Sequence, residues 1–142
     1  MLRVRTLVEN WPDGKIKLYT IWKTLGLRQQ LAELFTDGTY LPAQISGERS
    51  EHVTAFFRVS KNHSALTIAP KWLAASGLHE NWNAGTQFWS DTSIVLPTGS
   101  RAWRNVFTDE LMDSQPPDQD RIRIADALRH FPVALLSSVA TH

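Results

Sequence analysis

The sequence contains no cysteine, which excludes disulfide bonds and thiolate metal sites. It also lacks a long hydrophobic run. The longest apolar stretch, residues 131–136, is far shorter than the roughly 20 residues that a membrane-spanning helix needs. The first residues carry no apolar run of the kind found in a signal peptide. These absences are compatible with a reducing compartment, and we expect a cytoplasmic protein.

Positive and negative side chains are nearly equal in number. The chain carries 15 Lys and Arg against 14 Asp and Glu, a formal net charge of +1. The basic residues are scattered along the chain and form no basic tract. Long-range attraction to nucleic acid or to an acidic membrane is therefore not expected, and neither is predicted as a partner.

The patterns of metal, phosphate and nucleophile sites are also missing. The five histidines have no metal-ligand spacing, no glycine-rich phosphate loop is present, and no Gly-x-Ser-x-Gly elbow occurs. A carboxylate pair for glycoside chemistry would have to join Asp91 to Asp109 or Glu110. Each of these lies beside turn residues, where Asp commonly makes local hydrogen bonds. The sequence therefore predicts no catalytic, cofactor-binding or metal-binding residue.

Aromatic residues, in contrast, are abundant. The chain has six Trp and six Phe, and 42% of its residues are hydrophobic, which is enough for a core. An indole can stack on the apolar face of a sugar ring, but a small β domain also needs Trp in its core. Trp89 and Trp103 flank strand patterns and are predicted core residues. Trp72 and Trp82 lie in a looser stretch and are the candidates for sugar stacking.

A helical pattern begins after the turn signal Asp13-Gly14, where Asp13 is also a candidate N-cap. The helix is predicted over residues 15–31. Its apolar stripe has the spacing i, i+3, i+4 and i+7 and consists of Leu18, Ile21, Trp22 and Leu25. Gly26 within the helix costs about 1 kcal/mol relative to Ala, so we expect another part of the chain to pack closely against it.

From residue 40 the pattern becomes that of β-strands. Strands are predicted at residues 40–45, 52–59, 65–69, 87–89, 93–96 and 102–107, with turn residues between them. Pro42 favours an edge position for the first strand, because proline cannot donate a ladder hydrogen bond. The spacing predicts a mainly β fold, a small antiparallel β-sandwich with one helix before it and one after it.

The C-terminal third has a different composition. Residues 108–120 are polar and contain Pro116-Pro117, so they are predicted to form an exposed linker. A short amphipathic helix is expected over residues 121–130, and an apolar strand or tail follows it to residue 137. The apolar faces at both ends of the chain suit a missing neighbour, but packing of both helices on the sandwich itself fits the pattern equally well.

Several motifs occur in order along the chain. They lie at residues 13–28, 33–42, 52–58, 69–70, 89–97, 103–108 and 125–136. The most specific are Trp89-x-Asp91-Thr92 and the ending Phe131-Pro132-Val133-Ala134-Leu135-Leu136. Together they resemble the C-terminal end of maltooligosyltrehalose synthases, a family of the α-amylase clan.

The resemblance implies a parent enzyme of trehalose biosynthesis. Such an isomerase converts the reducing-end α-1,4 linkage of a maltooligosaccharide into an α,α-1,1 linkage, with a retaining carboxylate pair on a catalytic barrel. None of the family's catalytic positions maps onto this chain, so the piece would be structural and inactive alone. Residues 1–34 would be a remnant of the barrel and residues 35–142 an amylase-type C-terminal β domain.

The partner implied by the resemblance is the rest of the parent enzyme, which binds the maltooligosaccharide. The residues that would face the barrel are Leu18, Ile21, Trp22 and Leu25. Three alternatives stay open. The chain could be an α-glucan-binding module built on Trp72 and Trp82, the C-terminal domain of another amylase-clan enzyme, or a domain that self-associates through the exposed helix face.

Overall fold

The computed structural model describes residues 2–71, 86–97, 102–113 and 120–139. These residues form two antiparallel sheets. The larger has six strands in the order β1-β3-β4-β9-β6-β7, and the smaller has three in the order β2-β5-β8. The strands are β1 (Thr39–Pro42), β2 (Ile45–Ser46), β3 (Val53–Val59), β4 (Ser64–Pro70), β5 (Ser93–Val95), β6 (Ala102–Asn105), β7 (Leu111–Asp113), β8 (Arg121–Arg123) and β9 (Ala134–Ser138). The expected mainly β, antiparallel class is therefore confirmed.

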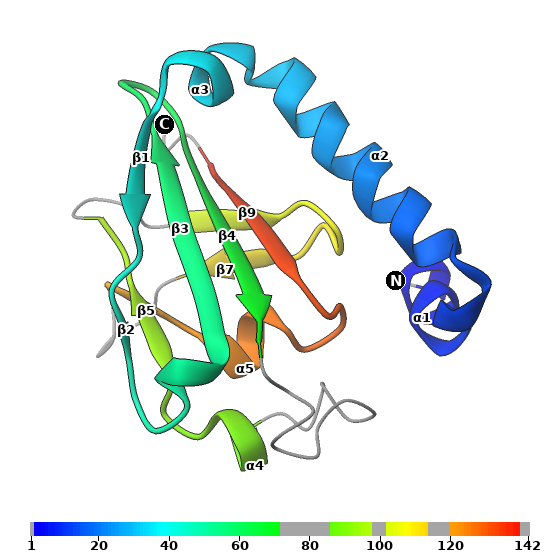
Figure 1. The fold of residues 1–142 in the computed structure, drawn as a ribbon. Helices are drawn as coiled ribbons and strands as arrows, with labels where there is room; N and C mark the ends of the chain where they lie inside the picture. Colours follow the sequence, from blue (N-terminus) through cyan, green and yellow to red (C-terminus); the bar gives the residue numbers. More distant parts are fainter. Residues whose placement is uncertain (1, 72–85, 98–101, 114–119, 140–142) are drawn as a thin grey trace.

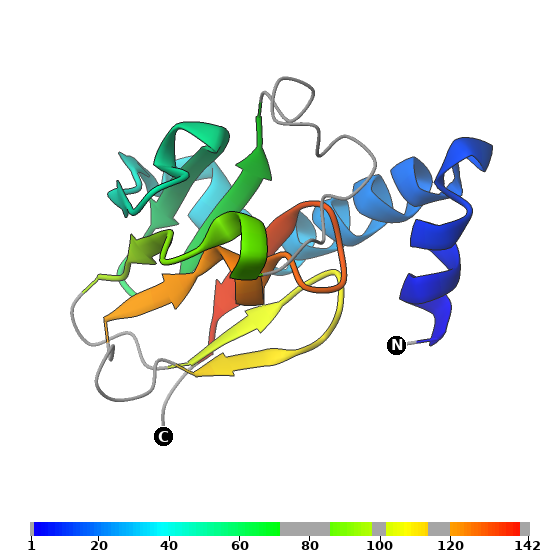
Figure 2. The same ribbon diagram turned by 90° about the horizontal axis from the view of Figure 1, so that it is seen from below.

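Helices are concentrated before the first strand (Figure 1). The helical segments are α1 (Leu2–Glu9), η1 (Trp11–Asp13), α2 (Lys15–Gln30), α3 (Ala32–Asp37), η2 (Ser50–His52), α4 (Thr86–Trp89) and α5 (Ile124–Ala127). The long helix α2 begins and ends within one residue of its predicted range. Helix α1 was not predicted from the sequence, and it lies at the far end of α2 from the strands (Figures 1 and 2).

Alternation along the central strands divides the core in two. Leu66 on β4 and Leu136 on β9 belong to the cluster that the smaller sheet completes with Ile94 and Ile122. Their neighbours Ala65 and Leu135 point to the opposite face of the larger sheet, because side chains alternate along a strand. Both join a second cluster with residues of α1, α2 and α3. Figure 2 accordingly shows α2 and the smaller sheet on opposite sides of β4 and β9.

The start of α2 uses both residues of the predicted turn. Gly14 is the N-cap and has a φ of 81°, a left-handed conformation that favours glycine. The Asp13 carboxylate accepts a hydrogen bond from the Lys15 backbone N–H at 2.9 Å. Asp13 thus serves the helix start from the position before the N-cap instead of being the N-cap itself.

The region predicted as one strand at residues 40–45 is divided between the two sheets. Strand β1 ends at Pro42, which pairs with Phe56 of β3 at the edge of the larger sheet. Strand β2 then starts at Ile45 and pairs with Ile94 in the smaller sheet. The predicted hairpin between residues 52 and 69 is confirmed as β3 and β4.

The prediction of a strand at residues 87–89 is wrong, because α4 occupies this position. Phe88 and Trp89 are consecutive and both buried, whereas a half-buried strand would send them to opposite faces. A helical turn brings both rings to the core, where they meet edge to face with centroids 4.8 Å apart.

The prediction of an exposed linker at residues 108–120 is wrong for its first half. Strand β7 pairs with β6, and Thr108 in the turn between them is buried. Asp109 closes this turn with a φ of 62°, a conformation that Asp tolerates better than most residues. Residues 114–119, with Pro116-Pro117, lie outside the described residues.

The predicted helix at residues 121–130 is limited to α5. Arg121 to Arg123 form β8 instead, because Ile122 and Ile124 alternate with arginines at the period of a strand. Ile122 pairs with Ile94 of β5, the central strand of the smaller sheet. The apolar stretch that follows was predicted to be a strand or a tail. It is a strand, β9, and it lies in the middle of the larger sheet.

Candidate functional site

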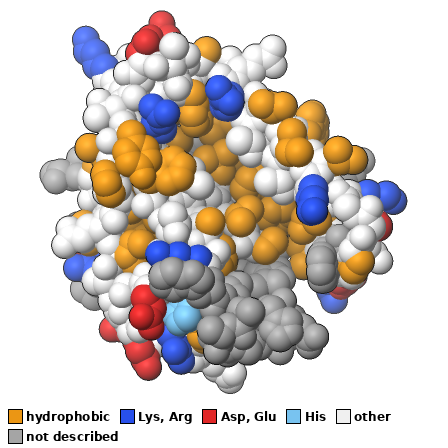
Figure 3. Space-filling view, viewed as in Figure 1, with side chains coloured by type: hydrophobic (Ala, Val, Ile, Leu, Met, Phe, Trp, Pro, Cys, Tyr) orange, Lys and Arg blue, Asp and Glu red, His pale blue; other side chains and the backbone are white. Residues whose placement is uncertain are grey.

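Helix α2 carries apolar residues on two opposite faces. The inner face contributes Leu27, Ile16 and Tyr19 to the second core cluster. The outer face has the four residues of the predicted stripe, with exposed fractions of 69% for Leu18, 55% for Ile21, 68% for Trp22 and 54% for Leu25. At 100° per residue, Leu18 lies directly opposite Leu27. Figure 3 shows hydrophobic side chains on the outer surface of this helix.

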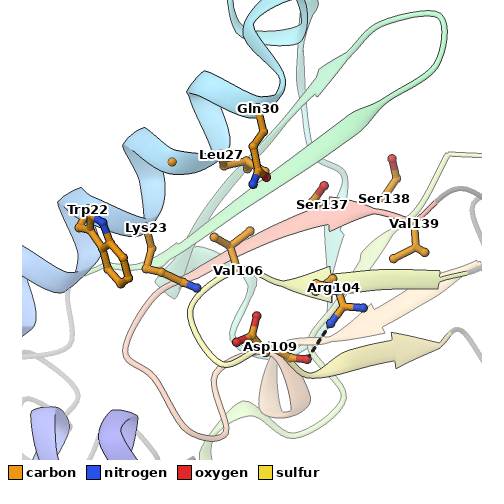
Figure 4. A pocket seen from close by; sticks show the side chains of 11 residues that line it. Trp22, Lys23, Leu27, Gln30, Arg104, Val106, Asp109, Ser137, Ser138 and Val139 are labelled. Atoms are coloured by element: carbon orange, nitrogen blue, oxygen red, sulfur yellow. Dashed lines mark hydrogen bonds between the residues drawn. The ribbon is translucent and has the colours of Figure 1, made fainter.

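A groove runs along the flank of α2, between the helix and the larger sheet. It has a volume of about 560 Å³. Its helix side is formed by Trp22, Lys23, Gly26, Leu27 and Gln30, and its sheet side by Arg104, Val106, Asp109, Ser137, Ser138 and Val139. In Figure 4 the Lys23 and Gln30 side chains extend from α2 into the space in front of β6 and β9.

Strand register aligns the polar residues on the sheet side of the groove. Arg104 of β6 is the direct partner of Ser137 of β9, so their side chains emerge on the same face. The turn after β6 adds Asp109, whose backbone carbonyl accepts a hydrogen bond from Arg104 Nη1 at 3.3 Å. Among the described residues this is the hydrogen bond that the Arg104 guanidinium makes, and it uses one of its five N–H donors.

The groove contains two cations and one carboxylate. The Lys23 ammonium lies 5.7 Å from the ring centroid of Trp22, within range of a cation–π interaction. Within the described ranges, neither the Lys23 ammonium nor the Asp109 carboxylate makes a hydrogen bond or an ion pair. Their polar atoms therefore keep their full capacity for an incoming molecule.

Tyr19 connects the groove to the core. Its hydroxyl donates a hydrogen bond to the Phe107 backbone carbonyl at 2.5 Å, and its ring packs against Trp22 and Phe131. Burial raises the pKa of Tyr19 above its usual value, and the negative charge of Asp109 raises it further. The phenol is thus held in its neutral form, which the hydrogen bond to Phe107 requires.

The surroundings of Gly26 differ from those expected from the sequence. A Cβ atom built on it would meet nothing within 4 Å, so the expected close packing against this residue is wrong. The residue lies instead at the groove, where its missing side chain widens the space beside α2. The sequence marked this glycine as unusual in mid-helix, but it was interpreted as a place of close packing and not as part of a groove.

The other predicted site residues are placed as follows. Trp89 and Trp103 are core residues with exposed fractions of 1% and 0%, as expected. Trp72 and Trp82, the predicted sugar platforms, lie outside the described residues. Asp109 and Arg104 of the groove were not predicted as binding residues, because nothing in the sequence aligns the β6–β7 turn with α2.

The Asp91-Thr92 part of the most specific motif has a structural role in this fold. The Asp91 carboxylate accepts a hydrogen bond from Glu48 N–H at 3.2 Å, and the Thr92 hydroxyl accepts one from Arg49 N–H at 3.0 Å. Gly47, with a φ of 114°, allows this loop to approach the Thr92 backbone. These contacts hold the segment after β2 against the start of β5.

Two further features bear on the kind of site. Among the residues that the structure describes, no group of three or more His, Asp or Glu is placed to hold a metal ion. In the same part of the chain, no helix has both the length and the apolar character needed to cross a bilayer.

Comparisons with protein-family models, with curated proteins and with solved structures found no match to this chain. The resemblance to maltooligosyltrehalose synthases therefore depends on the ordered motifs of the sequence.

Proposed function

We propose that this chain is the C-terminal domain of a trehalose-forming isomerase of the maltooligosyltrehalose synthase type. Its role is structural: the outer face of α2 packs on the catalytic barrel of the parent enzyme. The domain is of the amylase type, and the ordered motifs between residues 13 and 136 support this assignment.

The observation that carries the proposal is the outer stripe of α2. Leu18, Ile21 and Leu25 are each more than half exposed, on a helix whose inner face already packs on the sheet. A helix that buries only one face does not need a second apolar stripe. Burial of one such side chain is worth about 1.5–3 kcal/mol, so several together can hold two domains in contact.

A barrel from the parent enzyme is the occupant that suits this stripe. In a barrel fold the outer helices pack on their neighbours along both flanks, so the last helix needs apolar residues on more than one face. Helix α2 has this property, and it leads through α3 into the first strand of the β domain.

Reconstitution tests the proposal. The catalytic barrel of a maltooligosyltrehalose synthase, prepared without its own C-terminal domain, is mixed with this chain, and formation of the α,α-1,1 product from maltopentaose is measured. We expect the chain to bind the barrel and to raise its activity. The variant Leu18→Gln/Ile21→Gln/Leu25→Gln should weaken binding by at least 100-fold, since three buried side chains are lost.

The matched control is Lys17→Gln, an exposed position on the same helix. It should bind as the unchanged chain does. Sedimentation of the chain alone supplies the contrary outcome. If the chain forms a dimer that the triple variant abolishes, and no complex with the barrel is detected, the stripe serves self-association and the proposal fails.

A further inference from the structure

The outer face of the smaller sheet carries an arginine that extends across two serine hydroxyls. Arg121 of β8 donates from Nη1 to Ser46 Oγ of β2 at 2.7 Å and to Ser93 Oγ of β5 at 3.3 Å. Its side chain therefore crosses from β8 over β5 to β2. The neighbouring Ile94 and Ile122 point into the core, and side chains alternate along a strand. The three polar side chains thus share the face of the sheet that is turned away from the core.

Arg121 lacks a negative partner within the described part of the chain. The residue is half-buried, and its contacts there are the two hydrogen bonds to serine, with no ion pair. Both bonds start from Nη1, so the N–H groups of Nε and Nη2 keep their donor capacity. A guanidinium stays charged at every working pH, and its withdrawal from water is costly unless an opposite charge compensates. Its charge and its donors both favour an anion as a further partner.

The two serines add donors to the same place. Each hydroxyl oxygen of Ser46 and Ser93 already accepts a hydrogen bond from Arg121, so each hydroxyl keeps its own proton to donate. The cluster itself contains no carboxylate. A neutral polar molecule needs acceptors as well as donors, and a cation would be repelled. A cluster of donors around one guanidinium suits a ligand that only accepts hydrogen bonds, which is an oxyanion.

The surrounding charges indicate which kind of oxyanion. Arg123 is the direct cross-strand partner of Ser93, so it lies on the same face of the sheet. Its Nε lies 3.3 Å from an Asp126 carboxylate oxygen, and the same carboxylate also binds Arg129 at 2.7 Å. Residues 121–129 thus contribute three guanidinium groups and one carboxylate. This excess of positive charge favours a doubly charged ligand over a singly charged carboxylate.

We infer that Arg121, Ser46 and Ser93, with Arg123 beside them, form a binding site for a phosphate group, either the free ion or the monoester of a small molecule. The planar guanidinium matches two phosphate oxygens, and the hydroxyls serve the others. The smaller sheet and α2 lie on opposite sides of β4 and β9 (Figure 2). The site is therefore separate from the docking of α2 proposed above.

Titration of the complete chain at constant ionic strength tests the inference by NMR, with inorganic phosphate, phenyl phosphate and acetate as probes. We expect saturable shifts of the Ser46 and Ser93 amides and of the Arg121 Nε–H with both phosphates. The dissociation constant should be in the millimolar range, because water and salt screen an open site. Acetate, with one charge, should bind about 10-fold more weakly. Equal affinity for the two phosphates identifies the ion as the ligand, and tighter binding of phenyl phosphate identifies a monoester.

Three variants locate the binding. Arg121→Gln should weaken it about 10-fold, whereas Arg121→Lys keeps the charge without the planar donors and should retain part of the affinity. Ser46→Ala leaves the arginine in place and should weaken binding about threefold, through the lost hydroxyl donor. The matched control is Arg28→Gln, the same change at an exposed position on α2, which should bind normally. Thermal melting confirms that each variant is folded.

Four results would overturn the inference. The first is an absence of saturable shifts with either phosphate. The second is binding that Arg121→Gln leaves unchanged, which would place the phosphate elsewhere on the chain. The third is full affinity in both Arg121→Lys and Ser46→Ala, which would mean an adventitious ion only, attracted by charge without a built site. The fourth is acetate binding as tight as that of phosphate. None of these results alters the reconstitution assay, which depends on the outer stripe of α2.

Discussion

At the scale of single residues, Tyr19 links a titratable group to the packing of α2. Its phenol donates to the Phe107 carbonyl, and its pKa is raised by burial and by Asp109. A group whose pKa is raised on folding stabilises the folded state as long as that group is protonated. That stabilisation is complete below the unfolded pKa, near 10, and is lost as the pH rises through the folded value.

We therefore expect the free energy of unfolding to fall as the pH rises above about 10. In Tyr19→Phe this alkaline loss should be smaller, and the stability at neutral pH should be lower by about 1 kcal/mol, the usual value of one hydrogen bond. Urea unfolding at pH 7 and at pH 10.5 measures both effects. An equal alkaline loss in the two proteins would mean that other groups cause it.

Gly47 is a second residue whose effect can be predicted. A Cβ atom there would lie 2.5 Å from the Thr92 Cα, and the φ of 114° is itself unfavourable for other residues. Gly47→Ala should lower the free energy of unfolding by about 2–4 kcal/mol, since strain and collision add. Gly14→Ala is the matched control, because Gly14 has a φ of 81° but nothing within 4 Å. Its cost should be near 1 kcal/mol, from the backbone conformation alone. Similar losses in both variants would show that the approach of the loop to Thr92 contributes little.

At the scale of elements, α2 departs from the pattern of an ordinary surface helix. A surface helix of a globular domain has one apolar face and one polar face. In α2 the inner and outer faces are both apolar, and the polar side chains of Lys23 and Gln30 lie on the flank between them. The helix thus presents three different surfaces: a core contact, one side of a groove and an exposed stripe.

The glycine of this helix gives a prediction with the opposite sign to that for Gly47. Gly26→Ala should raise the free energy of unfolding by about 1 kcal/mol, because the helix gains propensity and the new methyl group enters open space. Circular dichroism during thermal unfolding measures the change. Gly38→Ala is the contrasting variant, since its Cβ would collide with the Leu34 carbonyl oxygen, and it should be destabilised. Loss of stability in Gly26→Ala would contradict the open groove.

At the scale of the whole molecule, Trp103 lies where the layers meet. It belongs to the cluster shared by both sheets, is fully buried and packs against Phe57 with ring centroids 6.1 Å apart. Within the described part of the chain its indole N–H has no hydrogen-bond partner. Trp103→Ala should cost about 3–5 kcal/mol, a large share of the stability of such a domain.

The Phe variant separates volume from polarity. Trp103→Phe keeps an aromatic ring and removes the unpaired N–H, so its cost should be well below that of Trp103→Ala. Urea titration of the three proteins, with the slope checked for constancy, measures the series. Equal costs for Phe and Ala would show that the indole N–H is paired and contributes to stability.

Elements that depend on local periodicity could be predicted from the sequence, whereas those that depend on distant strand pairing could not. The range of α2 and the β3–β4 hairpin followed from local periodicity, because both are continuous segments with a clear pattern. The strand β8 was missed although Ile122 and Ile124 alternate, since three residues are too few for a reliable period. The groove was not predicted, because Arg104, Asp109 and Ser137 meet α2 only through pairings between strands that are distant in the sequence.

The central place of β9 has a consequence for how the chain folds. This strand lies between β4 and β6, and its pairing joins Leu66 to Leu136, residues that are 70 positions apart. The β3–β4 hairpin can form early from local contacts, whereas the larger sheet remains in two halves until β9 is inserted. Contacts of such long range slow folding, because the loop must close before the pairing is gained. Insertion of β9 is therefore the step that we expect to limit the folding rate, and until it occurs the inner edges of β4 and β6 are open to pairing with other chains.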